Sequence, residues 1–297
     1  MTSYSPRAAA LVQEMEQAAA ADPACTVAFQ GAPGAYSHQA VREKFPGQPP
    51  LPCVAFEDAL EAVQKGRAAY AMIPIENSLH GRVADVHFLL PESGLHIIAE
   101  HFVRVRHCLL GLGAREDLRS VFSHPQALGQ CRGRLRGWGL EPVAHFDTAG
   151  AAAEVADSAD RSKGAIASKL AGELYGLQVL AEGIEDADHN TTRFVILAKE
   201  SVTVVPDTAA MTSLIFETRN VPASLYKALG GFATNGVNIT KLESYLRDGK
   251  FAAAEFYMDV EGASDTPALK LALEELAFHT KWIRLLGSYP RGRARDQ

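Results

Sequence analysis

Residues 189–197, HNTTRFVIL, bring an amide, two hydroxyls and a guanidinium to the start of an apolar run. A strand this apolar is expected to be buried, so the polar side chains before it should lie at the edge of a core and face a cleft. Hydroxyl and amide groups there could donate hydrogen bonds to a small substrate, and Arg193 could bind a carboxylate. The stretch fits equally well an ordinary junction of loop and strand in which Arg193 is solvated.

Small hydroxyl side chains stand at several places where an expected strand gives way to a helix. In QGAPGAYS, residues 30–37, two glycines precede Ser37, and the backbone N–H groups of such a helix start favour an anion. Ser123, Thr148 and Ser168 occupy comparable junctions further along the chain. N-capping explains each hydroxyl without a ligand, and the glycine spacing fits neither a dinucleotide fingerprint nor a phosphate loop.

The loop ENSLHGR, residues 76–82, is dense in polar groups and follows the apolar run AYAMIPI directly. Its polar side chains are Glu76, Asn77, Ser78 and His80. Ligands on parallel sheets bind beyond the carboxyl ends of the strands, so we expect this loop and residues 30–37 to border a site. Asn-Ser is also ordinary turn chemistry.

The elements that would position these loops alternate between strand and helix from residue 26 onward. The first unit has expected strands at 26–29, 53–56 and 69–75 and expected helices at 37–45 and 56–66. The second unit has expected strands at 141–146 and 164–168 and expected helices at 127–139, 148–158 and 168–176. Such alternation predicts mostly parallel sheets with right-handed crossovers. With residues 96–112 crossing between the units and a strand at 194–199 returning, we expect two lobes and a cleft.

The pattern changes class after a short linker that contains VPDT. The following strands and helices are expected in the order βαββαβ, with a hairpin turn at Asp248-Gly249. This order is the ferredoxin-like pattern. A domain of this size has a marginal core, so we expect it to pair with a copy of itself.

Composition limits the partners and the compartment. The net charge of −6 and the absence of a basic block give no footprint for nucleic acid or an anionic membrane. The four cysteines, Cys25, Cys53, Cys108 and Cys131, lack zinc-type spacing, so they are expected to be reduced thiols, mostly in the core. Glu14 and Glu16 stand where a signal peptide needs an apolar core, and no apolar run could span a bilayer, so a cytoplasmic location is expected. Residues 7–21 favour a weakly amphipathic helix for packing or oligomer contacts.

Several motifs in order carry a family resemblance: VAFQGAPGAYSHQA, IPIENSLHGRV, SHPQALGQC, DTAGAA, HNTTRF and the βαββαβ pattern. The chain resembles a monofunctional prephenate dehydratase followed by an ACT regulatory domain, from about residue 27 to residue 289. The resemblance implies an α/β fold with a two-lobed catalytic domain like the type II periplasmic binding proteins and a C-terminal ferredoxin-like βαββαβ ACT domain. The implied boundaries are an N-terminal helical extension at 1–24, a catalytic domain at 25–203 (lobe 1 at 25–100 and 190–203, lobe 2 at 101–189), a linker at 204–210 and an ACT domain at 211–297.

The resemblance also implies an activity, that of a carbon–oxygen lyase in phenylalanine biosynthesis. Prephenate would lose carbon dioxide and water to give phenylpyruvate, without a metal or an organic cofactor. Much of the driving force lies in the substrate, so the enzyme must orient it and donate to the leaving hydroxyl. By resemblance the catalytic residues are Thr192, Asn77, Ser123 and Gln130. Further substrate-binding residues are Ser37, Glu76, Thr148, Arg193 and Phe194.

The C-terminal domain departs from the family's inhibitor-binding motifs. Where the family has glycine-alanine-leucine, this chain has Ala223, Ser224 and Leu225. Where the family has glutamate-serine-arginine-proline, the chain has Glu243, Ser244, Tyr245 and Leu246. Asn235 and Asn238 remain. Feedback inhibition by phenylalanine at the interface of paired ACT domains, in a homodimer or homotetramer, is one hypothesis, and a purely dimerising module is the other.

Two other functions stay open at this point. Arogenate dehydratase differs only by an amine in place of the substrate's keto group. A non-catalytic amino-acid or keto-acid sensor would share the two-lobed fold, because fold alone does not fix function. The combination of Thr192 with Asn77 and Ser123 favours an enzyme, since a sensor would not need this set.

Overall fold

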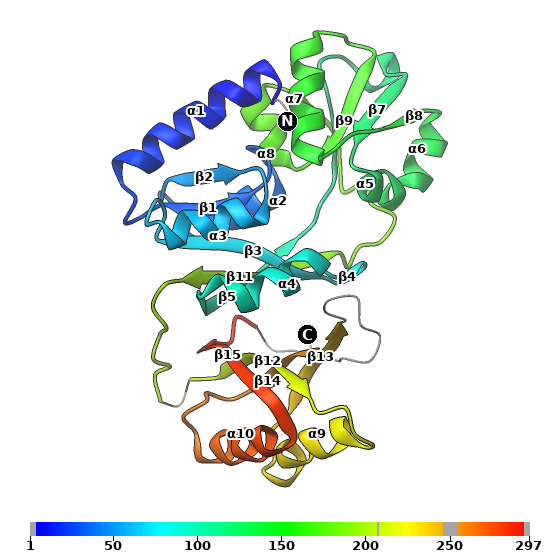
Figure 1. Cartoon of the computed structure of the whole chain (residues 1–297). Helices are drawn as coiled ribbons and strands as arrows, with labels where there is room; N and C mark the ends of the chain where they lie inside the picture. The colour runs from blue at the N-terminus through cyan, green and yellow to red at the C-terminus, as the bar shows by residue number, and fades with distance from the viewer. Residues whose placement is uncertain (1–3, 207, 246–254, 294–297) are drawn as a thin grey trace. The chain divides into compact units, whose positions relative to one another are not determined.

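The computed structural model describes residues 4–206, 208–245 and 255–293 of the 297-residue chain (Figure 1). The helices are α1 Pro6–Ala21, α2 Tyr36–Lys44, α3 Phe56–Gln64, α4 Ala84–Ser93, α5 Pro125–Gln130, α6 Arg132–Trp138, α7 Thr148–Ser158, α8 Lys169–Tyr175, α9 Ser224–Thr234 and α10 Pro267–His279, with a 3₁₀ turn at Arg115–Asp117. The strands are β1 Val27–Gln30, β2 Pro50–Cys53, β3 Tyr70–Asn77, β4 Gly81–Arg82, β5 His96–Arg104, β6 Cys108–Gly111, β7 Ser120–Ser123, β8 Glu141–Ala144, β9 Lys163–Ala167, β10 Gln178–Glu182, β11 Thr191–Ala198, β12 Ala210–Thr218, β13 Ile239–Tyr245, β14 Glu255–Glu261 and β15 Thr280–Pro290.

The first lobe is built on a sheet with the strand order β2-β1-β3-β11-β5, to which β4 adds by pairing with β3. β1 runs parallel to both β2 and β3, so the helices α2 and α3 make the crossovers that the alternation predicted. The second strand differs from its expected position, since it runs from Pro50 to Cys53 rather than over 53–56. Its two prolines disguise it, and they are tolerated because β2 lies at the edge of the sheet.

The second lobe carries a five-stranded sheet with the order β10-β6-β9-β7-β8. β7 is parallel to β8 and β9, whereas β6 is antiparallel to β9 and β10. The alanine-rich helix α7 packs into a core with β6, β9 and α8, because small side chains allow a close approach. The expected helix 127–139 is interrupted at Cys131, which divides it into α5 and α6. Together the two lobes confirm the expected two-lobed α/β architecture.

The C-terminal module has the element order β12-α9-β13-β14-α10-β15, which confirms the βαββαβ prediction. Its antiparallel sheet has the order β13-β14-β12-β15. α9 and α10 contribute to an apolar core on one face of the sheet, with Phe216, Met258 and Leu276 fully buried. The expected hairpin turn at Asp248-Gly249 lies outside the described residues.

Contacts between residues divide the chain into two compact units, Met1–Val83 with His101–Phe194, and Ala84–Glu100 with Val195–Gln297. Residues 84–100 therefore pack with the C-terminal module. The ring of His87 lies 5.0 Å from that of Tyr257, and the N–H of Gly292 donates to Glu100 Oε1 at 2.8 Å. A Cβ atom at Gly287 would overlap the carbonyl oxygen of Ile97, so these two backbones are in direct contact.

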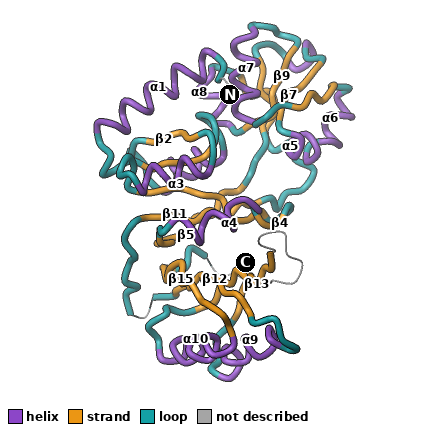
Figure 2. The backbone as a smooth tube through the Cα atoms, viewed as in Figure 1, coloured by secondary structure: helices purple, strands orange, loops and turns teal. Residues whose placement is uncertain are grey.

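All four cysteines are unpaired thiols; Cys25 is exposed and the other three are buried, as predicted. Across residues 4–206, 208–245 and 255–293, no helix is both long enough and apolar enough to cross a membrane. Figure 2 shows that helix and strand alternate through both lobes and through the C-terminal module.

Candidate active site

The β1–α2 loop of the first lobe is fastened to the second lobe. Tyr175 donates its hydroxyl to the carbonyl of Pro33 at 2.7 Å, and Ser168 donates to the carbonyl of Gly34 at 2.6 Å. Ser168 also caps α8 by accepting the N–H of Ala171 at 3.0 Å, so its predicted capping role is confirmed. Gly34 has φ +90°, and a Cβ there would lie 2.7 Å from the Cα of Ala171. Only glycine meets both requirements without strain.

A cluster of neutral polar side chains forms where β3 ends beside β11. The amide of Asn77 donates to Asn190 Oδ1 at 2.7 Å and to Thr192 Oγ1 at 3.0 Å. Its carbonyl oxygen accepts the backbone N–H groups of Leu79 and His80 at 3.0 and 3.1 Å. These bonds fix the orientation of the Asn77 side chain. The hydroxyl hydrogen of Thr192 has no acceptor among the described residues, so it can be donated to a ligand.

The cluster continues into the second lobe through Gln130. Asn190 Nδ2 donates to Gln130 Oε1 at 3.1 Å, and His107 Nε2 lies 2.6 Å from the same oxygen. Tyr36 closes the chain of bonds with its hydroxyl 2.9 Å from His107 Nδ1. Burial lowers the pKa of His107 and raises that of Tyr36, so both are neutral near pH 7. We call Tyr36, Asn77, His107, Gln130, Asn190 and Thr192 the amide cluster.

The alternation of side chains along a strand separates two neighbouring residues of β11. Thr192 contacts Asn77, whereas Arg193 donates to Glu76 Oε1 at 2.9 Å. Each pair joins consecutive positions of β3 and β11, so the two pairs lie on opposite faces of the sheet. The Arg193 side chain is only 3% exposed. Its contact with Glu76 braces the junction from the far side of the amide cluster.

Four other residues singled out from the sequence have side chains that make no hydrogen bond to the amide cluster within the described residues. Ser123 is fully buried and donates to the carbonyl of Ile166 at 2.6 Å. Ser37 is buried in the first turn of α2, and Phe194 is buried in the core. Thr148 is the first residue of α7, next to the capping Asp147. The structure thus brings together Asn77, Gln130 and Thr192.

Three members of the amide cluster were not named among the catalytic or substrate-binding residues: Tyr36, His107 and Asn190. Asn190 and Tyr36 lie in the stretches 189–197 and 30–37, which were expected to border a site, so their stretches gave a signal although the residues were not singled out. His107 lies 71 positions from Tyr36 in the sequence, and no local pattern joins the two. Their pairing follows from the contact between lobes.

An open hollow of about 330 Å³ adjoins the amide cluster. It is lined by Leu79, His80, Gln126, Gly129, Gln130, Glu185, Asp186 and Ala187. Gln130 of the cluster lines this hollow together with His80, whose Nδ1 lies 3.2 Å from the amide nitrogen of Gln130. Neutral amides and a hydroxyl can donate hydrogen bonds to a leaving oxygen without holding a departing carboxylate in an ion pair.

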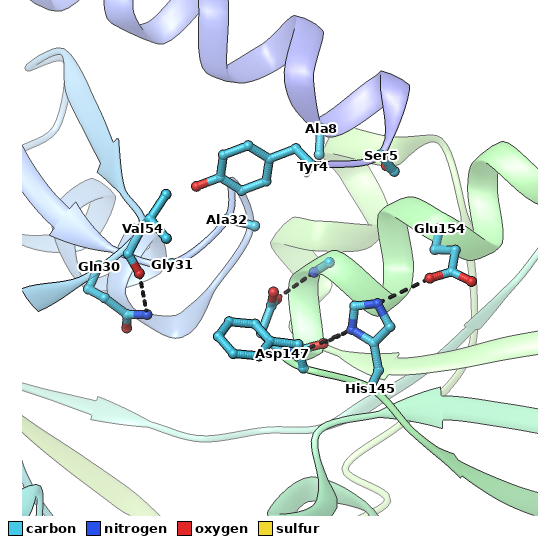
Figure 3. Close-up of a pocket in the computed structure, with 12 residues that line it drawn as sticks. Tyr4, Ser5, Ala8, Gln30, Gly31, Ala32, Val54, His145, Asp147 and Glu154 are labelled. Atoms are coloured by element: carbon cyan, nitrogen blue, oxygen red, sulfur yellow. Dashed lines mark hydrogen bonds and ion pairs between the residues drawn. The ribbon is translucent and has the colours of Figure 1, made fainter. Parts of the chain in front are cut away.

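A second cavity of about 360 Å³ lies beside α1 (Figure 3). Its lining comprises Tyr4, Ser5, Ala8, Gln30, Gly31, Ala32, Val54, His145, Phe146, Asp147, Gly150 and Glu154. None of these residues belongs to the amide cluster or to the hollow beside Gln130.

The residues expected to bind an effector lie around α9 and on the neighbouring strands. Ala223 precedes α9 with φ +60°, a left-handed conformation that glycine would adopt at lower cost. The Ser224 hydroxyl is buried without a hydrogen-bond partner among the described residues. Asn235 donates to the carbonyl of Gly231 at 2.8 Å. The further contacts are Asn238 to Glu261 at 3.3 Å and Lys241 to Glu243 at 3.3 Å, while Leu225 packs on the core and Ser244 lies on β13. Leu246 is outside the described residues.

Comparison with known proteins assigns the chain to a family. Residues 27–202, more than half of the chain, match the family model described as Prephenate dehydratase. A Komagataeibacter europaeus protein named Bifunctional N-acyl-homoserine lactone acylase/prephenate dehydratase is 51% identical over 267 residues, which are 89% of this chain and 95% of that protein. Arogenate dehydratase/prephenate dehydratase 1, chloroplastic, from Arabidopsis thaliana is 40% identical over 280 residues, covering 89% of this chain and 71% of the relative.

A solved structure agrees with the sequence relatives. The prephenate dehydratase of Arthrobacter aurescens in complex with L-Phe has a TM-score of 0.82 and 28% identity, covering 92% of this chain and 91% of that one. The similarity therefore extends over the two lobes and the C-terminal module together. With its amide cluster built from the motifs that the family model spans, the chain belongs to the prephenate dehydratase family of lyases.

Proposed function

We propose that the chain converts prephenate to phenylpyruvate by decarboxylating dehydration. The observation that supports this most is the amide cluster, in which Asn77 orients Thr192 at 3.0 Å in a chain of the prephenate dehydratase family. The ring C–O bond and the bond from the ring to its carboxylate both break. The electrons of the latter make the ring aromatic, carbon dioxide departs, and the hydroxyl leaves as water after taking up a proton.

Thr192 acts in this proposal as a positioned hydrogen-bond donor. A threonine hydroxyl is too weak an acid to transfer its proton fully, but a donor aimed at the leaving oxygen stabilises the charge that develops there. Asn77 and Gln130 would hold the substrate beside it. Ser123, Ser37, Thr148 and Phe194 would act through the packing behind the site and not by direct contact with the substrate, and Arg193 with Glu76 would keep the start of β11 in place. No cofactor is required in this scheme.

The direct test is to mix the purified full-length protein with prephenate and to follow phenylpyruvate. We expect catalysed formation that depends on Thr192. Absence of phenylpyruvate above the uncatalysed rate, from protein that is folded by circular dichroism, would contradict the proposal. A catalytically silent protein that binds prephenate would support a sensor instead.

Two alternatives are supported by the names of relatives. The Arabidopsis relative is named as an arogenate as well as a prephenate dehydratase, so arogenate is the second substrate to assay, with phenylalanine as its product. The Komagataeibacter relative is named as an acylase of N-acyl-homoserine lactones and is 51% identical to this chain. Incubation with such a lactone and detection of homoserine lactone would test that activity separately.

The C-terminal module would regulate this activity by binding phenylalanine. This is supported by a solved relative that is described as a complex with L-Phe. The effector residues would be Ala223, Ser224, Leu225, Asn235, Asn238, Glu243 and Ser244. Calorimetry should show heat when phenylalanine is added, and phenylalanine should lower the rate of phenylpyruvate formation. The absence of both effects would favour a purely dimerising module.

The proposed organisation is a helical extension at 1–24, a catalytic domain at 25–203 and a regulatory domain at 211–297 after the linker. A homodimer or homotetramer in the cytoplasm is proposed, and light scattering of the purified protein tests the oligomeric state.

A further inference from the structure

His80 lies in the turn between β3 and β4, three residues after Asn77 of the amide cluster. Asn77 and Gly81 are paired residues of these two strands, so residues 78–80 form a tight turn between them. The backbone N–H of His80 donates to Asn77 Oδ1 at 3.1 Å, which fixes the end of the turn. The imidazole is exposed and lines the hollow beside Gln130. His80 therefore connects the amide cluster to a space that is open to solvent.

The ring of His80 has a bonding partner whether or not its Nδ1 carries a proton. Nδ1 lies 3.2 Å from Asn77 Oδ1, which is an acceptor because it also accepts two backbone N–H groups. Nδ1 lies equally 3.2 Å from the amide nitrogen of Gln130, which is a donor. A protonated Nδ1 donates to Asn77, and an unprotonated Nδ1 accepts from Gln130. No described residue bonds to Nε2, so this nitrogen can exchange a proton while the ring keeps its position.

One side-chain amide holds both His80 and Thr192. The oxygen of Asn77 faces the ring of His80 at 3.2 Å, and its nitrogen donates to Thr192 Oγ1 at 3.0 Å. This shared partner fixes the imidazole and the hydroxyl relative to one another.

The proposed reaction needs a proton that Thr192 cannot release. Expulsion of the hydroxyl as water consumes one proton, and a threonine hydroxyl is too weak an acid to supply it. His107 is buried, and its two ring nitrogens face Tyr36 and Gln130 at 2.9 and 2.6 Å. Of the imidazoles in the amide cluster and in the described lining of the hollow, His80 is the one that can reach a ligand with a ring nitrogen.

The charged and titratable groups around His80 come from two other segments. Glu185 and Asp186 line the hollow beside it, and each accepts a backbone N–H at 2.9 Å, so they serve as acceptors there. His124 caps α5. Burial lowers the pKa of His124, Asp147 raises it and the charge of His80 lowers it, with burial the largest effect. A positive charge on His80 is thus opposed by two carboxylates and by an imidazole that stays neutral near pH 7.

We propose that His80 is the proton donor for the hydroxyl that leaves the substrate. This role rests on the proposed dehydratase function. The Nε2–H bond of the imidazolium breaks while an O–H bond of the departing water forms, and the ring C–O bond and the bond to the ring carboxylate break. Prephenate and the imidazolium thus give phenylpyruvate, carbon dioxide, water and a neutral imidazole. Nδ1–H keeps its bond to Asn77 throughout, and the exposed ring regains its proton from solvent.

The pH dependence of kcat tests this role. At saturating prephenate, kcat of the full-length protein should fall as the pH rises between about 5 and 8, the range in which histidine normally loses its proton. His80→Asn should lower kcat by about 100-fold or more and should remove this slope. An asparagine amide can donate to Asn77 and accept from Gln130, but it has no proton to release. The matched control is His101→Asn, because His101 pairs with Glu43 at 2.8 Å outside the hollow, and it should keep the wild-type kcat and slope.

The same rates separate proton donation from a structural role. The KM for prephenate should change by less than about threefold in His80→Asn, as expected for a group that acts in the transition state. His80→Gln is a second variant with the same expected outcome. A wild-type kcat in these variants, or a lower kcat with the slope unchanged, would overturn the proposal. If the wild-type protein itself forms no phenylpyruvate, the dehydratase function is refuted and this role with it.

Discussion

Replacing Thr192 by valine isolates the hydroxyl that the proposed reaction needs. Valine keeps the branched shape that suits β11 and changes only the hydroxyl to a methyl group. The amide of Asn77 would lose an acceptor at 3.0 Å but would keep Asn190 Oδ1 at 2.7 Å. The free energy of unfolding should therefore fall by about 1 kcal/mol or less.

The effect on catalysis should be much larger than the effect on stability. The Thr192 hydroxyl accepts from Asn77, so its own hydrogen is available to the leaving oxygen. Loss of one such positioned donor lowers kcat by about 100- to 1000-fold, which corresponds to about 2.7–4 kcal/mol in the activation free energy.

Initial rates of phenylpyruvate formation at saturating prephenate measure this effect. Thr192→Ser is the matched control, because it restores the hydroxyl, and its kcat should stay within about tenfold of the wild type. A Thr192→Val enzyme with wild-type turnover and normal unfolding would refute the assignment of Thr192 as the donor.

Three further predictions concern stability. Burial, with a smaller contribution from Arg42, lowers the pKa of His38 from 6.5 to about 4. The stability that comes from keeping His38 neutral is therefore fully present above pH 6.5 and is lost as the pH falls toward 4. The loss amounts to about 3 kcal/mol, and His38→Gln should abolish it in urea titrations at pH 7 and pH 4. Gly34→Ala should destabilise the protein by about 1–3 kcal/mol more than Gly47→Ala, since both glycines have a positive φ but only Gly34 meets neighbouring backbone; equal midpoints in urea would contradict this. Glu76→Gln should lower the free energy of unfolding by about 1–2 kcal/mol, because it removes the carboxylate charge that accepts from the buried Arg193 at 2.9 Å, and a change under about 0.5 kcal/mol in the same titration would contradict this.

Much of the fold followed from local patterns in the sequence. Alternating apolar runs and amphipathic stretches predicted the strands and helices of both lobes, because each sheet and each helix must bury one face. The change to βαββαβ marked the C-terminal module, and its sheet order agrees with that pattern. α4 was missed, since it contains Pro91 and has only a weak apolar periodicity. The break at Cys131 was also missed, because the helical composition continues on both sides of it.

The candidate site was only partly predictable, for a physical reason. Asn77 and Thr192 could be found because each lies in a polar motif at the end of a buried strand. Their neighbours Tyr36 and His107 join the cluster only through the packing of one lobe on the other. Ser123 shows the opposite case, because it begins the SHPQALGQC motif but its hydroxyl donates to the backbone carbonyl of Ile166 in β9. Which side chains face a site depends on tertiary contacts that local sequence does not encode.

Residues 84–100 tie the C-terminal module to the part of the chain that follows the 76–82 loop. Because His87, Ile97 and Glu100 all contact that module, the module cannot be removed without exposing these residues. Excising it would uncover the surface on which this segment folds and would loosen the exit from the loop that carries Asn77. Gain or loss of the module during evolution would therefore have required changes in the residues of α4 and β5 that contact it.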